Sequence, residues 1–224
     1  MPLLLLDLDN TLVDRAVGYR RWAAEYLRER DADPALLEAM VRADGDGLRP
    51  KPEVAADLTA LLQLTGPEST SIVRILRAGV VAHLELAAGC AAALGRARAA
   101  GWTPWIVSNG VTEQQEKKIH RLGLERLVDG WVISEEAGAA KPDPQIFTIA
   151  AQRAGLPLTG AWMVGDSAEA DIIGAHRAGL ECVYLHRGRA WDPALRPPNA
   201  AAGSLAEAIT VVLSSTDAGR PAER

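Results

Sequence analysis

Acidic residues follow two short apolar runs of this chain at the points where the runs end. Asp7 and Asp9 come after the run 3–6, and Asp166 comes after the run 162–164. Two carboxylates about 4 Å apart repel each other by roughly 4 kcal/mol at an effective dielectric constant near 20. A hard divalent cation relieves that repulsion, and oxygen ligands favour Mg²⁺. These acids predict a magnesium site, whereas the plainer alternative for residues 9–11 is a turn that caps a helix.

Two further segments carry groups that suit an anion. Ser108 and Asn109 follow the apolar run 105–107, and Gly110 loosens the backbone where a helix is expected to begin, so that N–H and O–H donors are available. Lys141 lies in a proline-fixed loop. Because ligands of open α/β sheets bind outside the carboxyl ends of the strands, these donors and the acids are expected to share one rim. A solvated surface position is the alternative for the lysine.

Short, continuous apolar runs predict the strands that position these groups. Runs without alternation suit strands that are buried on both faces of a parallel sheet. The runs lie at 3–6, 105–107, 131–133, 162–164 and 182–185, and helical segments lie at 91–99, 113–122, 144–154 and 169–178. Strands that alternate with helices predict right-handed crossovers, and therefore an α/β fold with a Rossmann-like parallel sheet core.

The interval after the first run carries helical patterns and no convincing strand. One face of a helix is apolar from Tyr19 to Leu27, and similar stripes cover 54–62 and 72–80. Antiparallel helices of this length form a bundle with its own core. We therefore predict an α/β core domain of residues 1–14 and 86–213 and a helical cap domain of residues 15–85; one continuous domain is the alternative.

The end of the chain predicts a loop, a helix and a tail. Prolines mark a loop over 187–199, and an apolar stripe predicts a last helix over 205–213. Residues 214–224 are polar and small, and we expect them to form a disordered tail.

Composition excludes several classes of protein. The 224 residues include 29 acidic and 24 basic side chains, with a formal net charge of −5, so no general attraction to nucleic acid or an anionic membrane is expected. Two cysteines outside any C-x-x-C pair form no disulfide scaffold. No run reaches the roughly 20 apolar residues of a membrane span, and the apolar opening is too short for a signal-peptide core. A cytoplasmic protein without nucleic-acid or membrane partners is expected.

The order of these motifs resembles one known family. Four motifs are similar to those of the haloacid dehalogenase-like (HAD) hydrolase superfamily. They are Asp-x-Asp-x-Thr at 7–11, Ser-Asn-Gly at 108–110, Lys-Pro at 141–142, and Gly-Asp at 165–166 with an acid five residues on. The resemblance is to phosphatase members with a helical cap inserted after the first strand. It implies a HAD-like core and an inserted α-helical cap.

The resemblance also implies roles for particular residues. Asp7 would be the nucleophile that forms an aspartyl-phosphate, and Asp9 the general acid and then the base. An acid at the position of Asp9 argues for a phosphatase, because the similar dehalogenases lack it. Ser108 with the backbone N–H of Asn109 would hold the phosphoryl oxygens, and Lys141 would neutralise the phosphate and Asp7.

Magnesium ligands follow from the same resemblance. Mg²⁺ would be held by the carboxylates of Asp7 and Asp166 and by the main-chain carbonyl of Asp9. Asp171 would orient a metal-bound water, with an ordinary helix-face carboxylate as the alternative. Thr11 would support the loop, and a plain turn hydroxyl is equally consistent with the sequence.

The function implied is Mg²⁺-dependent hydrolysis of a small phosphorylated metabolite by a monomer or homodimer. Nucleoside monophosphate, sugar phosphate and phosphoglycolate remain open as substrates, and the stretch 134–143 is similar to that of nucleotidase-like members. A phosphomutase of the same fold and a non-catalytic phosphometabolite-binding module are alternatives.

Two groups of basic residues lie outside the motifs. Arg20 and Arg21 of the cap are candidates for contact with an anionic substrate, with a solvated helix edge as the alternative. Lys117, Lys118 and Arg121 are interpreted as a solvated helix face and not as a nucleic-acid patch.

Overall fold

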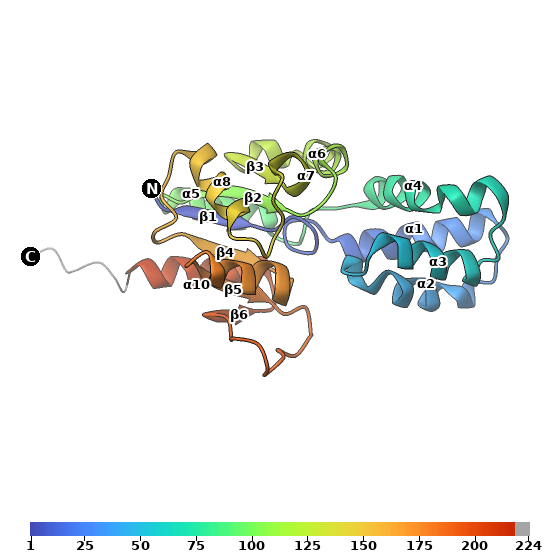
Figure 1. The fold of residues 1–224 in the computed structure, drawn as a ribbon. Helices are drawn as coiled ribbons and strands as arrows, with labels where there is room; N and C mark the ends of the chain where they lie inside the picture. Colours follow the sequence, from blue (N-terminus) through green and yellow to red (C-terminus); the bar gives the residue numbers. More distant parts are fainter. Residues whose placement is uncertain (218–224) are drawn as a thin grey trace, which may run out of the picture. The chain divides into compact units, whose positions relative to one another are not determined.

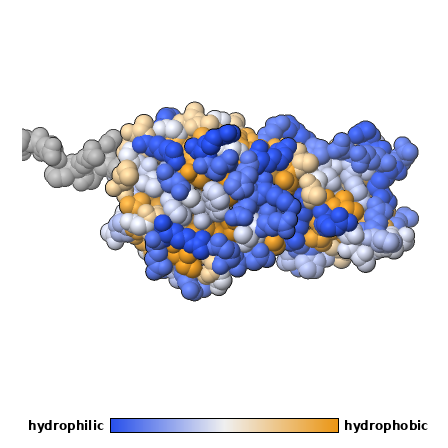
Figure 2. All heavy atoms as spheres, turned by 90° about the horizontal axis from the view of Figure 1, so that it is seen from above, coloured by the Kyte–Doolittle hydropathy of each residue, from blue (hydrophilic) through white to orange (hydrophobic). Residues whose placement is uncertain are grey.

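The computed structural model describes residues 1–217 of the chain. These residues form two compact units, of which one contains Met1–Val13 together with the described chain from Leu86 onward, and the other contains Asp14–Glu85. None of the helices within residues 1–217 is both long enough and apolar enough to cross a bilayer. On the face shown in Figure 2, hydrophilic residues predominate and hydrophobic ones form small separate areas.

A parallel sheet of six strands forms the centre of the first unit, in the order β3-β2-β1-β4-β5-β6 (Figure 1). The strands are β1 (Leu3–Leu6), β2 (Thr103–Ser108), β3 (Gly130–Ile133), β4 (Trp162–Gly165), β5 (Glu181–Leu185) and β6 (Ala200–Ala202). All five pairings are parallel, so every strand ends at the same edge of the sheet. The predicted α/β class is confirmed. Strand β6 was not predicted, because three alanines lack the β-branched and aromatic side chains that mark strands.

Helices of the first unit follow the strands that they connect. They are α5 (Cys90–Ala99), α6 (Thr112–Arg121), α7 (Ser134–Ala137), α8 (Gln145–Ala154), α9 (Gly174–Arg177) and α10 (Leu205–Asp217), with a short 3₁₀ turn at Leu124–Arg126. The helix predicted over 169–178 differs in kind: it begins as a π-helical segment, Ala168–Ile173, and continues as α9. Helix α10 continues through Asp217, so the predicted tail was placed too early, and residues 218–224 lie outside the described residues.

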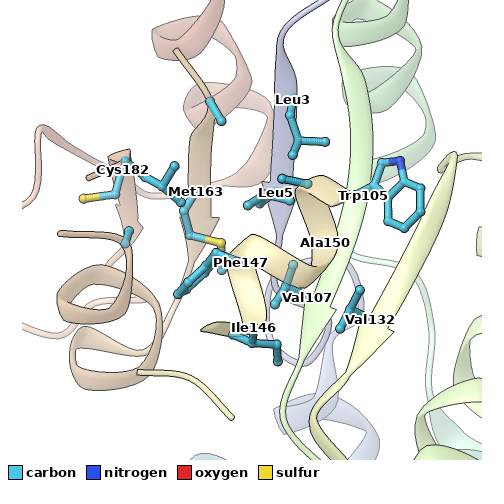
Figure 3. Packing of buried hydrophobic residues seen from close by; sticks show 14 of the residues in the cluster. Leu3, Leu5, Trp105, Val107, Val132, Ile146, Phe147, Ala150, Met163 and Cys182 are labelled. Atoms are coloured by element: carbon cyan, nitrogen blue, oxygen red, sulfur yellow. The ribbon is translucent and has the colours of Figure 1, made fainter. Parts of the chain in front are cut away.

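Buried apolar side chains hold α8 against one face of the sheet. Figure 3 shows Phe147 of α8 beside Met163 of β4, and Ile146 of α8 near Val107 of β2. All four side chains are fully buried. The four leucines of β1 are also fully buried, which explains why this strand is a continuous apolar run. The packing fixes the direction of β1, and with it the place where the following acidic residues emerge.

The second unit is entirely helical, and no strand lies within residues 14–85, all of which the structure describes. Its helices are α1 (Arg15–Glu29), α2 (Leu37–Asp44), α3 (Lys51–Leu61) and α4 (Gly66–His83), with 3₁₀ turns at Pro34–Leu36 and Gly45–Gly47. Helix α1 packs against α2 and α4, and α3 packs against the same two helices. The apolar stripes predicted a buried helical face, and Tyr19, Trp22, Leu58 and Leu76 do lie in the core of this unit.

Candidate active site

The carboxyl ends of three adjacent strands bring most of the candidate residues to one place. Strand β1 lies between β2 and β4. Asp7 follows β1, Ser108 is the last residue of β2, and Asp166 follows β4. The backbone N–H of Asp7 donates to the carbonyl oxygen of Val164 at 3.0 Å, so the β1–β4 ladder continues up to the first acid. All three residues are buried, with at most 8 % of each residue's surface exposed.

Lys141 lies at the centre of this group. Its ammonium nitrogen donates to Asp7 Oδ1 at 2.7 Å and to the carbonyl oxygen of Val107 at 2.7 Å. The same nitrogen lies 2.7 Å from Asp171 Oδ1. Burial by itself disfavours a charged lysine, but the carboxylates of Asp171 and Asp7 outweigh it and raise the pKa of Lys141. The ammonium is therefore charged at any pH near neutrality.

For the pKa of Asp7, the effect of burial outweighs that of the oppositely charged neighbour. Burial raises the pKa of its carboxyl to about 8, Lys141 opposes that rise, and the neighbouring carboxylates of Asp171 and Asp166 add to it. Lys141 and Arg189, which pairs with Asp166, bring two positive charges to three buried carboxylates, so one negative charge is left uncompensated. The arrangement therefore favours the arrival of further positive charge beside Asp7.

Asp7, Asp166 and Asp171 form a compact acidic trio. One carboxylate oxygen from each lies within 4.8 Å of the others, and all three residues are buried. Three hard oxygen donors suit Mg²⁺ better than a softer metal. A Cβ atom at Gly165 would overlap the Asp171 carboxylate, so glycine is required at this position for Asp171 to approach the end of β4. The donor set therefore fits the predicted metal.

Asp171 and Asp166 each have a second partner. Oδ2 of Asp171 accepts from the backbone N–H of Ser167 at 2.9 Å, which leaves Oδ1 facing Lys141. Arg189 donates from Nη2 to Asp166 Oδ2 at 2.8 Å and to the main-chain oxygen of Asp166 at 2.6 Å. Sequence reasoning missed Arg189, because a single basic residue in the loop after β5 resembles any exposed arginine.

Asn109 fixes the loop that carries Lys141. Its side-chain amide donates from Nδ2 to the Lys141 carbonyl oxygen at 2.8 Å and accepts at Oδ1 from the Lys141 backbone N–H at 2.9 Å. Reciprocal bonds of this kind hold the lysine backbone on both sides. Ser108 is buried beside it, and its Oγ accepts from Gln115 Nε2 at 2.7 Å. The side chain of Asn109 thus positions Lys141, a role distinct from the backbone contact expected from the sequence.

Asp9 is held by helix α6. Lys118 donates from Nζ to both carboxylate oxygens of Asp9, at 2.8 and 2.6 Å, and Gln115 Nε2 donates to Oδ2 at 3.1 Å. The interpretation of Lys118 as part of a solvated helix face was wrong: the residue is only 2 % exposed. Its neighbours Lys117 and Arg121 are exposed, as expected. Lys118 is buried because the face of α6 that contains Gln115 and Lys118 packs toward the loop after β1.

The two arginines named as substrate contacts lie on α1 of the helical unit, and each pairs with an acid of that unit. Arg20 pairs with Glu38, and Arg21 lies 2.5 Å from Glu85. Both side chains are about half exposed. The other candidates thus come together within the α/β unit, and Arg20 and Arg21 belong to the helical unit.

Comparison with known proteins identifies a family and several partial relatives. A model of the haloacid dehalogenase-like hydrolases matches residues 1–179. A glyceraldehyde 3-phosphate phosphatase of Methanopyrus kandleri is 41 % identical over 95 residues, which are 42 % of this chain and 41 % of that protein. A pyrimidine 5'-nucleotidase of Escherichia coli is 40 % identical over 103 residues, 46 % of each chain. The chain thus spans less than half the length of these curated relatives.

Solved structures share the fold of both units. A HAD-superfamily hydrolase of Geobacter sulfurreducens superposes with a TM-score of 0.70 at 17 % identity, covering 95 % of this chain and 96 % of that one. A 2-haloacid dehalogenase of Pseudomonas syringae gives 0.62 at 24 % identity, covering 96 % and 99 %. At these identities the likeness establishes the fold alone.

Proposed function

Since the chain belongs to the haloacid dehalogenase-like hydrolase family, we propose that it is a phosphatase that hydrolyses a small phosphorylated metabolite with Mg²⁺. The observation that carries the proposal is the contact of 2.7 Å between Lys141 Nζ and Asp7 Oδ1 beside two further buried carboxylates. A nucleophile, a cation for the phosphate and a set of metal ligands then occupy one site. The names of the partial relatives, which include three kinds of phosphomonoesterase, support the same class.

Two in-line displacements account for the reaction. In the first, a carboxylate oxygen of Asp7 attacks phosphorus, an aspartyl-phosphate forms, and the bond from phosphorus to the leaving oxygen breaks. Asp9 donates a proton to that leaving oxygen. In the second, Asp9 accepts a proton from water, whose oxygen attacks phosphorus, so that inorganic phosphate leaves and Asp7 is restored.

Electrostatic stabilisation falls to the surrounding groups. Lys141 and the donors at Ser108 and the backbone of Asn109 would hold the oxygens of the transferring phosphoryl group. Asp7, Asp166 and the main-chain oxygen of Asp9 would hold Mg²⁺, with Asp171 orienting a coordinated water. When bound, the ion supplies positive charge against the phosphoryl oxygens and the acidic trio.

Substrate selection is assigned to the helical unit, residues 15–85, acting as a cap. Arg20 and Arg21 would contact an anionic part of the substrate by exchanging their present carboxylate partners for it. The leaving groups named for the relatives differ widely, from a triose to a pyrimidine nucleoside and serine. We therefore propose a small phosphorylated metabolite as the class of substrate, and the experiment below identifies the leaving group.

Release of inorganic phosphate from a panel of about a hundred phosphorylated metabolites tests the proposal. The panel includes glyceraldehyde 3-phosphate, pyrimidine nucleoside monophosphates, phosphoserine, phosphoglycolate and glucose 1-phosphate, and product analysis of the last detects a mutase. We expect Mg²⁺-dependent phosphate release that Asp7→Asn abolishes and that the exposed control Asp31→Asn leaves unchanged. Full activity in Asp7→Asn would refute the proposed nucleophile, and an inactive wild-type protein across the panel would refute the phosphatase.

A further inference from the structure

Helix α6 contacts both Asp9 and Ser108 through two side chains one turn apart, Gln115 and Lys118. We propose that Lys118 and Gln115 are positioning residues that hold the carboxylate of Asp9 in the place from which it transfers protons. The inference rests on the proposed function, because it assigns to Asp9 the exchange of a proton with the leaving group and with water.

Lys118 restrains Asp9 through both carboxylate oxygens. The Nζ–Oδ1 and Nζ–Oδ2 distances of 2.8 and 2.6 Å describe a symmetric contact, which removes rotation of the carboxylate about its last bond. The ammonium group is buried, with a side-chain exposure of 3 %, whereas the Asp9 side chain retains 24 %. The Asp9 side chain thus remains partly accessible to solvent, whereas the Lys118 side chain does not.

Gln115 connects the acid to the phosphate-binding serine. Its Nε2 lies 3.1 Å from Asp9 Oδ2, 2.7 Å from Ser108 Oγ and 3.4 Å from the Asn109 carbonyl oxygen. A carboxylate and a carbonyl only accept hydrogen bonds, so the amide nitrogen must face them. One buried amide therefore fixes the separation between Asp9 and Ser108. That separation decides whether the acid reaches the leaving oxygen when Ser108 holds the phosphoryl group.

Burial of two polar side chains on one face of α6 argues against a purely structural role. Residues three apart lie on the same face of a helix, and Ile119 beside them supplies the apolar contact that packs α6. A buried ion pair is seldom more stabilising than well-packed apolar residues of similar volume. The burial of Lys118 and Gln115 on this face is explained by the Asp9 carboxylate that they hold in place.

The dependence of rate on the leaving group distinguishes positioning from stability. Departure of a basic phenol needs a proton from Asp9, whereas p-nitrophenol leaves readily as an anion. For Lys118→Met we expect kcat/KM for phenyl phosphate to fall about 100-fold, at the lower end of general-acid contributions, and the value for p-nitrophenyl phosphate to fall less than tenfold. Lys118→Arg should recover most of the phenyl phosphate activity, and the exposed neighbour in Lys117→Met should behave as wild type.

Gln115→Met provides a second variant that removes no charge, should Lys118→Met fail to fold. Gln115→Met should lower kcat/KM for phenyl phosphate more than for p-nitrophenyl phosphate, as Lys118→Met does, but by a smaller factor. Equal losses for both aryl phosphates in the folded variants, or wild-type rates in both, would overturn the positioning role. If the positioning role fails in this way while the wild-type protein is active and Asp7→Asn is inactive, the proposed phosphatase activity is still supported. If the wild-type protein shows no turnover, both proposals are refuted.

Discussion

The ammonium nitrogen of Lys141 lies 2.7 Å from Oδ1 of Asp7, although 134 positions separate the two residues in the chain. The contact depends on Asn109, whose amide binds the Lys141 backbone at both its N–H and its carbonyl oxygen. Three separate segments, which follow β1, follow β2 and precede α8, therefore have to be folded before Asp7 and Lys141 meet.

The raised pKa of Asp7 predicts how stability of the metal-free protein changes with pH. Burial raises this pKa from an ordinary 3.8 to about 8, so between these values the folded state keeps a proton that the unfolded state has lost. The stability contributed by protonated Asp7 is complete below pH 3.8 and is lost as pH rises toward 8. Asp7→Asn keeps a neutral group there at every pH.

Thermal unfolding of the two proteins in EDTA measures this contribution. We expect the difference in Tm between Asp7→Asn and wild type to grow in favour of the variant from pH 5 to pH 8, by a few degrees. Comparing the same pair at each pH cancels the titration of distant groups. A difference that stays constant over this range, or that shrinks, would contradict the raised pKa.

The proposed binding of Mg²⁺ to the acidic trio predicts stabilisation of the folded protein by mass action. A ligand at 100 times its dissociation constant stabilises by about 2.7 kcal/mol, and 1 kcal/mol corresponds to roughly 2–4 °C in a chain of this size. Titration of the metal-free protein with Mg²⁺ should therefore raise Tm by several degrees. Asp166→Asn should lose most of this rise and the exposed Asp192→Asn should retain it; an equal response from both would place the ion elsewhere.

Arg189 would compete with the proposed metal for Asp166, because its guanidinium lies 2.8 Å from the carboxylate. Arg189→Gln removes that positive charge and leaves a side chain that still donates hydrogen bonds. We expect Mg²⁺ to bind this variant several-fold more tightly, as measured by calorimetric titration of metal-free protein at low ionic strength. Arg196→Gln, a change at an exposed arginine, controls for net charge, and weaker binding by Arg189→Gln would show that the arginine instead supports the metal ligand.

A buried ion pair within the helical unit predicts a large loss of stability. Arg15 donates to both carboxylate oxygens of Asp44, at 2.6 and 2.8 Å, and both side chains are buried. Arg15→Met removes both of these hydrogen bonds from the buried Asp44 carboxylate, with Lys51 Nζ 3.8 Å away, and should lower the free energy of unfolding by about 3–5 kcal/mol in urea denaturation. Arg20→Met breaks an exposed pair with Glu38 and should lower the free energy of unfolding far less, because water screens the two charges. Similar losses in the two variants would contradict the difference in burial.

Much of the α/β unit could be predicted from local patterns. Five of the six strands were identified because strands buried on both faces must be apolar at every position, as the fully buried leucines of β1 are. The acids after β1 and β4, Ser108 and Lys141 were identified because parallel strands end at one edge. Strand β6 was not predicted, because the three alanines Ala200–Ala202 do not form a strongly apolar run.

Tertiary structure alone decided which further basic residues, beyond Lys141, join the site. Lys117 and Lys118 are adjacent and identical in type, yet the first is exposed and the second is buried against Asp9, 109 positions away. Successive residues on a helix differ by about 100° in direction, so their environments depend on what packs against each face. A local pattern contains no information about that packing. The sequence therefore determined the strands and the motifs that follow them, and only the folded chain assigned Lys118, Gln115 and Arg189 to these acids.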